Sequence, residues 1–200
     1  MLDAALPNAG EVRARCLAKT DWELGYPYTG EVWPGMRATP ALLDEELSTL
    51  DAKVCLLTGA KKVWVEQAET GMRLNHNCVQ VVGSVEGAVK PHTDSTNLCR
   101  YAAVLYLNPD VPSQCGTSFF RQRMPGGQLG GNIVMPPYRT LAEALGNRFV
   151  QPNAFVEDVR VEHRFNRLLV YKANLIHSAT AYWGLETATK RMTAVFFWMA

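Results

Sequence analysis

The segment Lys-Pro-His-Thr-Asp at residues 90–94 holds two residue types that bind metals, His92 and Asp94, on either side of a single threonine. Side chains at positions i and i+2 of an extended strand point to the same face, so an imidazole nitrogen and a carboxylate oxygen could bind one ion here. A third ligand must come from elsewhere in the chain, and His177 is the best candidate. Two histidines and one carboxylate on one face of an octahedral ion suit Fe(II) and leave coordination positions open.

Two other histidines are alternatives to His177 as the third ligand. His76 precedes the strand that leads towards the motif, and His163 lies shortly before a turn at Asn166. We interpret both as ordinary surface or hydrogen-bonded histidines. A single His-x-Asp motif is a weak signal by itself, so the prediction depends on the elements that position these residues.

Composition is typical of a globular protein with one domain. The chain has 200 residues, of which 48% are hydrophobic and 20% are charged, which is enough for a sizeable core. A net charge of +1 argues against nucleic acid or an acidic membrane as a partner. No secretory signal is recognisable, and no apolar run approaches the roughly 20 residues of a membrane-spanning helix. Five scattered cysteines without CxxC spacing argue against a disulfide framework or a structural zinc site and favour a cytoplasmic protein.

Residues 1–74 are expected to form helices and a loop that pack on a sheet. One short helix is predicted within residues 1–20, with residues 11–19 as its charged part. A second is predicted over residues 40–57, with Thr39 as N-cap and a proline at the first helical position. Between them, residues 22–37 are rich in proline, glycine and aromatic residues. This composition predicts an irregular loop, which could line a pocket or simply cover the edge of the core.

The rest of the chain, residues 75–200, alternates short strands with turns. Strands are predicted at residues 63–65, before this region, and within it at residues 77–82, 100–109, 117–121, 156–162, 168–171 and 191–198. Many short strands with few helices predict a mainly β fold with flanking helices, a jelly roll. Residues 122–155, with one short helix at 140–145, are interpreted as an insertion that acts either as a lid or as a passive surface excursion.

The order of these motifs resembles that of the Fe(II)/2-oxoglutarate-dependent dioxygenases, most closely the prolyl-hydroxylase-like and phytanoyl-type branches. The matching pieces are His92-Thr93-Asp94, Tyr106-Leu107-Asn108-Pro109, residues 116–120, residues 166–171, His177 and Arg191-Met192-Thr193. The resemblance covers roughly residues 75–200. It implies a double-stranded β-helix, which is a jelly roll with the metal at its mouth.

This resemblance also implies roles for individual residues. The two histidines and the aspartate would bind Fe(II), and Arg191 would pair with the distal carboxylate of 2-oxoglutarate, because a guanidinium matches a carboxylate bidentately. Thr193 would add a hydrogen bond, and Gln80 would either contact the cosubstrate or substrate or be a packed polar core residue. With O2 as oxidant, 2-oxoglutarate would yield succinate and CO2. An aspartate at position 94, in place of the small residue of halogenating relatives, favours hydroxylation, desaturation or cyclisation.

Substrate contacts are predicted from the front loop and from the ends of two strands. The candidates are Tyr28, Trp33, Arg37, Arg100 and Arg121. An arginine at the mouth of the barrel would suit a substrate carboxylate, although each of these side chains can equally be a surface residue. We expect a small, amino-acid-derived substrate, and the sequence leaves the oligomeric state open, a homodimer included.

Two other functions are compatible with the same residues. One is a cupin-like metal enzyme that uses the same ligands without 2-oxoglutarate. The other is a non-catalytic jelly-roll binding module with a relict site. Arg191 discriminates the first from an oxygenase, because only 2-oxoglutarate requires a cation at that position.

Overall fold

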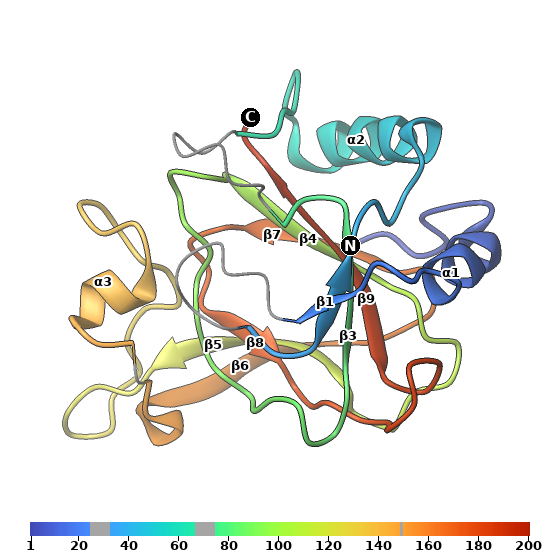
Figure 1. Cartoon of the computed structure of the whole chain (residues 1–200). Coiled ribbons are helices and arrows are strands. Elements are labelled where there is room, and N and C mark those ends of the chain that lie inside the picture. The colour runs from blue at the N-terminus through green and yellow to red at the C-terminus, as the bar shows by residue number, and fades with distance from the viewer. Residues whose placement is uncertain (25–32, 67–74, 149) are drawn as a thin grey trace.

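A computed structural model describes residues 1–24, 33–66, 75–148 and 150–200 (Figure 1). Its strands are β1 (Glu23–Leu24), β2 (Met36–Ala38), β3 (Cys78–Val82), β4 (Tyr101–Tyr106), β5 (Gly116–Gln122), β6 (Phe155–Glu162), β7 (Leu168–Lys172), β8 (His177–Ala179) and β9 (Arg191–Trp198). Its helices are α1 (Ala9–Leu17), α2 (Asp44–Thr58), α3 (Leu141–Leu145) and the short 3-10 helix Pro152–Ala154. In this part of the chain one antiparallel sheet has the strand order β1-β2-β3-β9-β4-β7 and a second has the order β6-β5-β8. The predicted mainly β architecture with flanking helices is confirmed.

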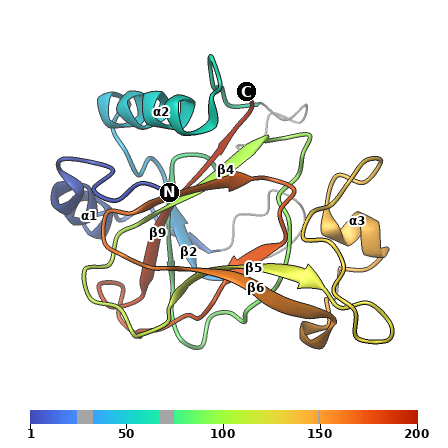
Figure 2. The same ribbon diagram turned by 180° about the vertical axis from the view of Figure 1, so that it is seen from behind.

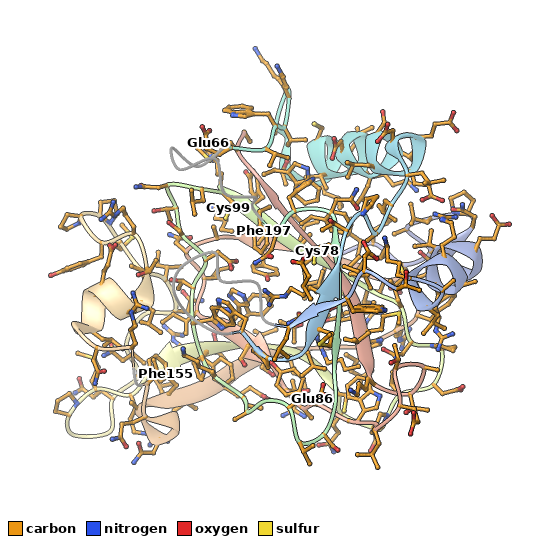
Figure 3. All side chains as sticks on the ribbon, in the orientation of Figure 1. Glu66, Cys78, Glu86, Cys99, Phe155 and Phe197 are labelled. Carbon is orange, nitrogen blue, oxygen red and sulfur yellow. The ribbon has the colours of Figure 1, made fainter. Side chains whose placement is uncertain are left out.

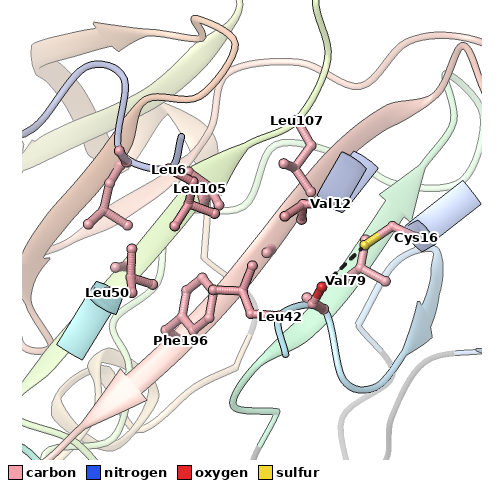
Figure 4. Packing of buried hydrophobic residues seen from close by; sticks show 14 of the residues in the cluster. Leu6, Val12, Cys16, Leu42, Leu50, Val79, Leu105, Leu107 and Phe196 are labelled. Atoms are coloured by element: carbon pink, nitrogen blue, oxygen red, sulfur yellow. Dashed lines mark hydrogen bonds between the residues drawn. The ribbon is translucent and has the colours of Figure 1, made fainter. Parts of the chain in front are cut away.

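The outer face of the larger sheet is covered by α1 and α2. Alternation along β4 directs Ala103 and Leu105 to this face, where they join a buried cluster that includes Val12 of α1 and Leu50 of α2. Figure 4 shows this cluster between the helices and the sheet. The helices and the sheet are thus joined by the main hydrophobic core.

The inner face of the larger sheet is turned towards the smaller sheet. The remaining residues of β4, among them Val104 and Tyr106, lie on this face and pack with Tyr171 of β7 and Phe119 of β5. Phe197 of β9 belongs to the same cluster (Figure 3). Because successive residues of a strand face opposite sides, every second residue of β2, β3 and β9 is available to the space between the sheets.

The predicted start of the second helix is wrong. Thr39 is not its N-cap, because α2 begins at Asp44. The backbone of Ala41 and Leu42 is instead bonded to Asn77: Ala41 N–H donates to its carbonyl and Leu42 N–H to its side-chain oxygen, both at 2.8 Å. Pro40, predicted as the first residue of a helix, therefore lies in a connecting segment that is hydrogen-bonded to Asn77, just before β3.

Other boundaries also differ from the predictions. The loop predicted for residues 22–37 contains the short strands β1 and β2, and the strand predicted at 63–65 is reduced to a single bridge between Trp64 and Met199. The strand predicted at 100–109 ends at Tyr106. The remaining predicted strands and α3, with Thr140 as its N-cap, agree to within one or two residues.

The region predicted as an insertion runs along one end of the two sheets. Figures 1 and 2 show α3 on the side of the molecule that is opposite α1 and α2. Its residues make isolated bridges rather than regular strands, such as the bridge between Ile133 and Leu175. Among the described residues, no helix is long and apolar enough to span a membrane.

Candidate metal centre

The two segments that carry the candidate metal ligands are hydrogen-bonded neighbours. His92 N–H donates to the carbonyl of His177 at 3.0 Å, and His177 N–H donates back to the carbonyl of His92 at 2.8 Å. His177 opens β8, so the His92 segment extends the smaller sheet by one bridge. Asp94 N–H donates to the carbonyl of Ala173 at 2.9 Å. These bonds hold His92 and Asp94 on one face, as the His-x-Asp spacing predicts.

The three side chains converge on one point. One ligand atom of each of His92, Asp94 and His177 lies within 4.8 Å of the others. His177 Nε2 is 3.7 Å from Asp94 Oδ2, and the two imidazole ring centroids are 4.4 Å apart. Asp94 Oδ2 is buried without a hydrogen-bond partner in the described structure. A buried, unpaired carboxylate oxygen beside two imidazoles is costly unless a cation is bound there, so this donor set fits a divalent metal ion.

Hydrogen bonds orient both imidazoles for metal binding. His92 Nδ1 lies 2.8 Å from the carbonyl of Lys90, and His177 Nδ1 lies 2.8 Å from the carbonyl of Leu175. A carbonyl can only accept, so each Nδ1 carries the proton and each Nε2 presents its lone pair to the centre. The hydroxyl of Tyr171 lies 3.1 Å from His177 Nε2, beside the metal centre.

Burial keeps the imidazoles in the form that binds a metal. Burial and, to a smaller extent, the neighbouring His177 lower the pKa of His92 to about 4, against the opposing effect of Asp94. Burial likewise lowers the pKa of His177 to about 4. Burial raises the pKa of Asp94 to about 6, partly offset by His92. Neutral imidazole is the ligand form.

The metal centre opens into a cavity of about 620 Å³ between the two sheets, a size typical of small-molecule sites. Its walls include Val104, Val195 and Phe197 from the larger sheet. Arg191 and Thr193 of β9 also line it. Arg191 therefore shares one cavity with the three candidate metal ligands.

Arg191 is deeply buried in the wall of this cavity. Its side chain is only 4% exposed, Nη1 donates to Thr193 Oγ1 at 3.3 Å, and Nε has no hydrogen-bond partner in the described structure. The guanidinium carbon lies 5.9 Å from the centre of the Tyr182 ring. A buried guanidinium with unused donors is suited to bind a carboxylate.

One family of proteins matches almost the whole chain, over residues 1–197, and it is described as a family of unknown function, DUF6445. The chain belongs to the DUF6445 family. A search of curated proteins gave no match.

A solved structure shows which fold this DUF6445 chain has. The non-haem α-ketoglutarate-dependent epimerase SnoN from nogalamycin biosynthesis is similar with 18% identity and a TM-score of 0.51, over 98% of this chain and 76% of SnoN. A prolyl-4-hydroxylase from Pseudomonas putida is similar with 16% identity and a TM-score of 0.47, over 98% of this chain and 90% of the hydroxylase. The likeness to SnoN shows the fold, and the predicted jelly roll is confirmed.

The structure places some predicted cofactor and substrate residues of this DUF6445 chain in the cavity. Gln80, Trp33 and Arg37 line it together with Arg191 and Thr193. Trp33 packs against the ring of His92, with centroids 4.7 Å apart, and Gln80 Nε2 donates to the carbonyl of Pro34 at 3.0 Å.

Other predicted substrate residues lie elsewhere. Arg100 is exposed at the start of β4, and Arg121 donates from Nε to the carbonyl of Gly130 at 3.0 Å, within the region predicted as an insertion. Neither is among the described residues that line the cavity. Tyr28 lies outside the described residues.

The alternative third ligands are held away from the metal centre. His76 packs against Phe196 and Trp198, with ring centroids 5.8 and 5.3 Å away. His163 is buried and stacks on Tyr106 at 4.3 Å. Among the described residues, neither histidine belongs to the metal-binding cluster.

Two tyrosines of the site were missed by reading the sequence. Tyr171 is the penultimate residue of β7, six residues before His177, and its alternation with Leu169 could have indicated an inward-facing side chain. Tyr182 lies in the connection between β8 and β9, where no periodicity indicates its direction. Both line the cavity.

Proposed function

We propose that this protein is a non-haem Fe(II)- and 2-oxoglutarate-dependent oxygenase that acts on a small molecule. The observation that carries the proposal is the buried Arg191, which lies in the same cavity as the converging side chains of His92, Asp94 and His177. A metal centre alone is compatible with several classes of enzyme. A buried cation in the same cavity adds a site for the distal carboxylate of a 2-oxo diacid.

Each residue has a defined task in this proposal. The two imidazole Nε2 atoms and the Asp94 carboxylate would hold Fe(II), and Arg191 with the Thr193 hydroxyl would bind the distal carboxylate of 2-oxoglutarate. The apolar walls and Trp33 would exclude water from the site. Fe(II) with 2-oxoglutarate and O2 would supply oxidative decarboxylation to succinate and CO2, coupled to hydroxylation, desaturation or cyclisation of the substrate.

Anaerobic titration of the protein with Fe(II) and then 2-oxoglutarate tests this function. We expect a visible metal-to-ligand charge-transfer band that His177→Ala abolishes. Arg191→Gln should weaken 2-oxoglutarate binding by one to two orders of magnitude, because a hydrogen bond between charged groups contributes about 1.5–3 kcal/mol. Arg100→Gln, at an exposed arginine outside the cavity, is the matched control and should leave the binding unchanged.

Turnover provides the second part of the test. Succinate formation should require Fe(II), 2-oxoglutarate and O2 together. Metal binding without any response to 2-oxoglutarate would instead indicate a cupin-like enzyme, and failure to bind Fe(II) would leave a non-catalytic module. Either outcome would overturn the proposal.

A further inference from the structure

A second arginine, Arg37, is buried in the wall of the same cavity. It is the middle residue of β2, and its neighbours Met36 and Ala38 pack into the outer core. Alternation therefore turns Arg37 towards the space between the sheets. Its side chain is only 6% exposed, and it lines the cavity together with the metal centre.

The guanidinium of Arg37 lacks the partners that a buried cation requires. Its Nε and Nη1 are buried and have no hydrogen-bond partner in the described structure. Arg167, which is buried to the same 6%, is instead paired through Nε and Nη2 with both carboxylate oxygens of Asp3, and its Nη1 donates to the carbonyl of Glu162. Burial lowers the pKa of Arg37, yet arginine keeps its charge in proteins. An unpaired buried charge destabilises the fold, so the presence of Arg37 at this position indicates that a ligand pairs with its guanidinium.

Arg37 and Arg191 occupy different places on the cavity wall. Arg37 is directly opposite Gln80 of β3, and Gln80 is directly opposite Thr193 of β9. Strands in a sheet are about 4.8 Å apart, so the backbones of Arg37 and Thr193 are separated by roughly 10 Å. Arg191 is hydrogen-bonded to Thr193, so the site proposed for 2-oxoglutarate lies on β9. Arg37 lies two strands away from it, on β2.

The charges of the proposed metal and cosubstrate site and of the two buried arginines differ by one. The other charged side chains of the cavity wall, Lys90, Glu143 and Arg148, are half-buried or exposed. The double positive charge of Fe(II) and the single charge of Arg191 are balanced by Asp94 and the dianion of 2-oxoglutarate. The positive charge of Arg37 is then left over. One further carboxylate would neutralise it and match the guanidinium bidentately.

We propose that Arg37 binds the carboxylate of the substrate, so that the substrates of this enzyme are small carboxylic acids such as amino acids and their N-acyl derivatives. This inference rests on the function proposed above. The cavity must hold 2-oxoglutarate as well, and much of its remaining wall is apolar, with Val104, Val195 and Phe197. The substrate is therefore a compact molecule with one anionic end and an apolar body.

The first test needs no knowledge of the substrate. In the ligand-free protein, Arg37→Met removes an uncompensated buried charge and keeps an unbranched apolar side chain in place of the arginine stem, so the melting temperature should rise by roughly 2–4 °C or more. Arg167→Met, at an equally buried but paired arginine, should lower it. A fall for Arg37→Met as large as that for Arg167→Met would show that Arg37 stabilises the fold, and would overturn the proposal.

The second test uses the protein loaded anaerobically with Fe(II) and 2-oxoglutarate. The probes are the proteinogenic amino acids and their N-acetyl derivatives, each paired with its primary amide, and the signal is the change that a probe causes in the charge-transfer band. We expect at least one acid to bind and its amide to fail. Arg37→Gln should weaken that acid at least tenfold and change 2-oxoglutarate binding less than twofold.

Three results of the second test would overturn the proposal. They are equal binding of acid and amide, no binding by any acid of the panel, and a loss of 2-oxoglutarate affinity in Arg37→Gln as large as in Arg191→Gln. Near-ultraviolet circular dichroism of each variant verifies that it is folded, and Arg37→Lys retains the charge if Arg37→Gln is not folded. A wild-type protein that gives no charge-transfer band with Fe(II) and 2-oxoglutarate would contradict the proposed function itself, which distinguishes the two failures.

Discussion

At the scale of single residues, burial decides what each histidine of this chain does. In the metal centre, a backbone carbonyl fixes each Nδ1 proton and leaves Nε2 available. His76 is half-buried, but its ring lies against Phe196 and Trp198 and its Nδ1 donates to the carbonyl of Phe197 at 2.8 Å. Its neutral ring is therefore part of the core and has no metal to bind.

His76 should make stability depend on pH. Burial lowers its pKa from 6.5 to about 4, so between these values the unfolded chain binds more protons than the folded one, and stability falls as the pH falls from 6.5 towards 4. At pH 5 the expected loss of unfolding free energy that is due to His76 is roughly 2 kcal/mol. Urea unfolding at pH 7.5 and 5 measures it. His76→Asn keeps a hydrogen-bond donor near the position of Nδ1 and does not titrate.

Comparison of His76→Asn with the wild type isolates this contribution, because all other titrating groups are common to the two proteins. The variant should lose roughly 2 kcal/mol less than the wild type between the two pH values. Equal losses would show that His76 is not responsible.

At the scale of elements, the region predicted as an insertion is bonded to both segments that carry the candidate metal ligands. Thr93, between the two ligands of the His-x-Asp motif, accepts a hydrogen bond from Leu141 N–H of α3 at 2.8 Å. On the other side, Ile176 N–H, next to His177, donates to the carbonyl of Asn132 at 2.9 Å. These contacts favour a region that holds the two segments in place, which we call the brace, over a lid that opens as one piece.

Thr93→Val tests the brace. Valine has nearly the same shape but cannot accept the hydrogen bond, which leaves a buried N–H of Leu141 unsatisfied and should cost about 1–3 kcal/mol of unfolding free energy. Hydrogen exchange of the Leu141 amide should become faster, while Thr93→Ser should behave as the wild type. Unchanged exchange in Thr93→Val would favour a region that moves independently of the metal centre.

How well an element could be predicted from sequence depends on how far its signal is local. The strands β3, β4, β5, β6, β7 and β9 have apolar runs or alternation, and the structure contains all of them. The predicted start of α2 was wrong because Asn77, about 35 residues further along, is hydrogen-bonded to the backbone of Leu42, where the predicted helix would begin. β2 was missed because its three residues are a strand only through pairing with β3.

The same limit applies to the candidate site. The His-x-Asp spacing and the later His177 could be found because strand geometry relates sequence spacing to direction. Arg37, Arg100 and Arg121 were equivalent in sequence, and only the paired strands show that the first is buried in the cavity while the other two are not. The depth of a side chain depends on contacts far apart in the chain, which spacing does not contain.

At the scale of the whole molecule, two cores lie on opposite faces of one sheet. The outer core joins α1 and α2 to the sheet, and the inner core joins the sheet to the smaller sheet and to the site. Trp198 of β9 belongs to the outer core and its Nε1 donates to Asp51 of α2 at 2.8 Å. Because both cores share β4 and β9, damage to the outer core should unfold the site as well.

This coupling can be tested by replacing each of two leucines of α2 with alanine. Leu50 is fully buried and Leu56 is 85% exposed. Leu50→Ala should lower the unfolding free energy by about 2–5 kcal/mol, whereas Leu56→Ala should change it by less than about 0.5 kcal/mol. Under denaturant, tryptophan fluorescence and the Fe(II)–2-oxoglutarate band should be lost at one midpoint in both variants, as expected for a single cooperative unit. If Leu50→Ala lost its fluorescence transition first and kept the band, the helices and the site would be separate units and the shared strands would not couple them.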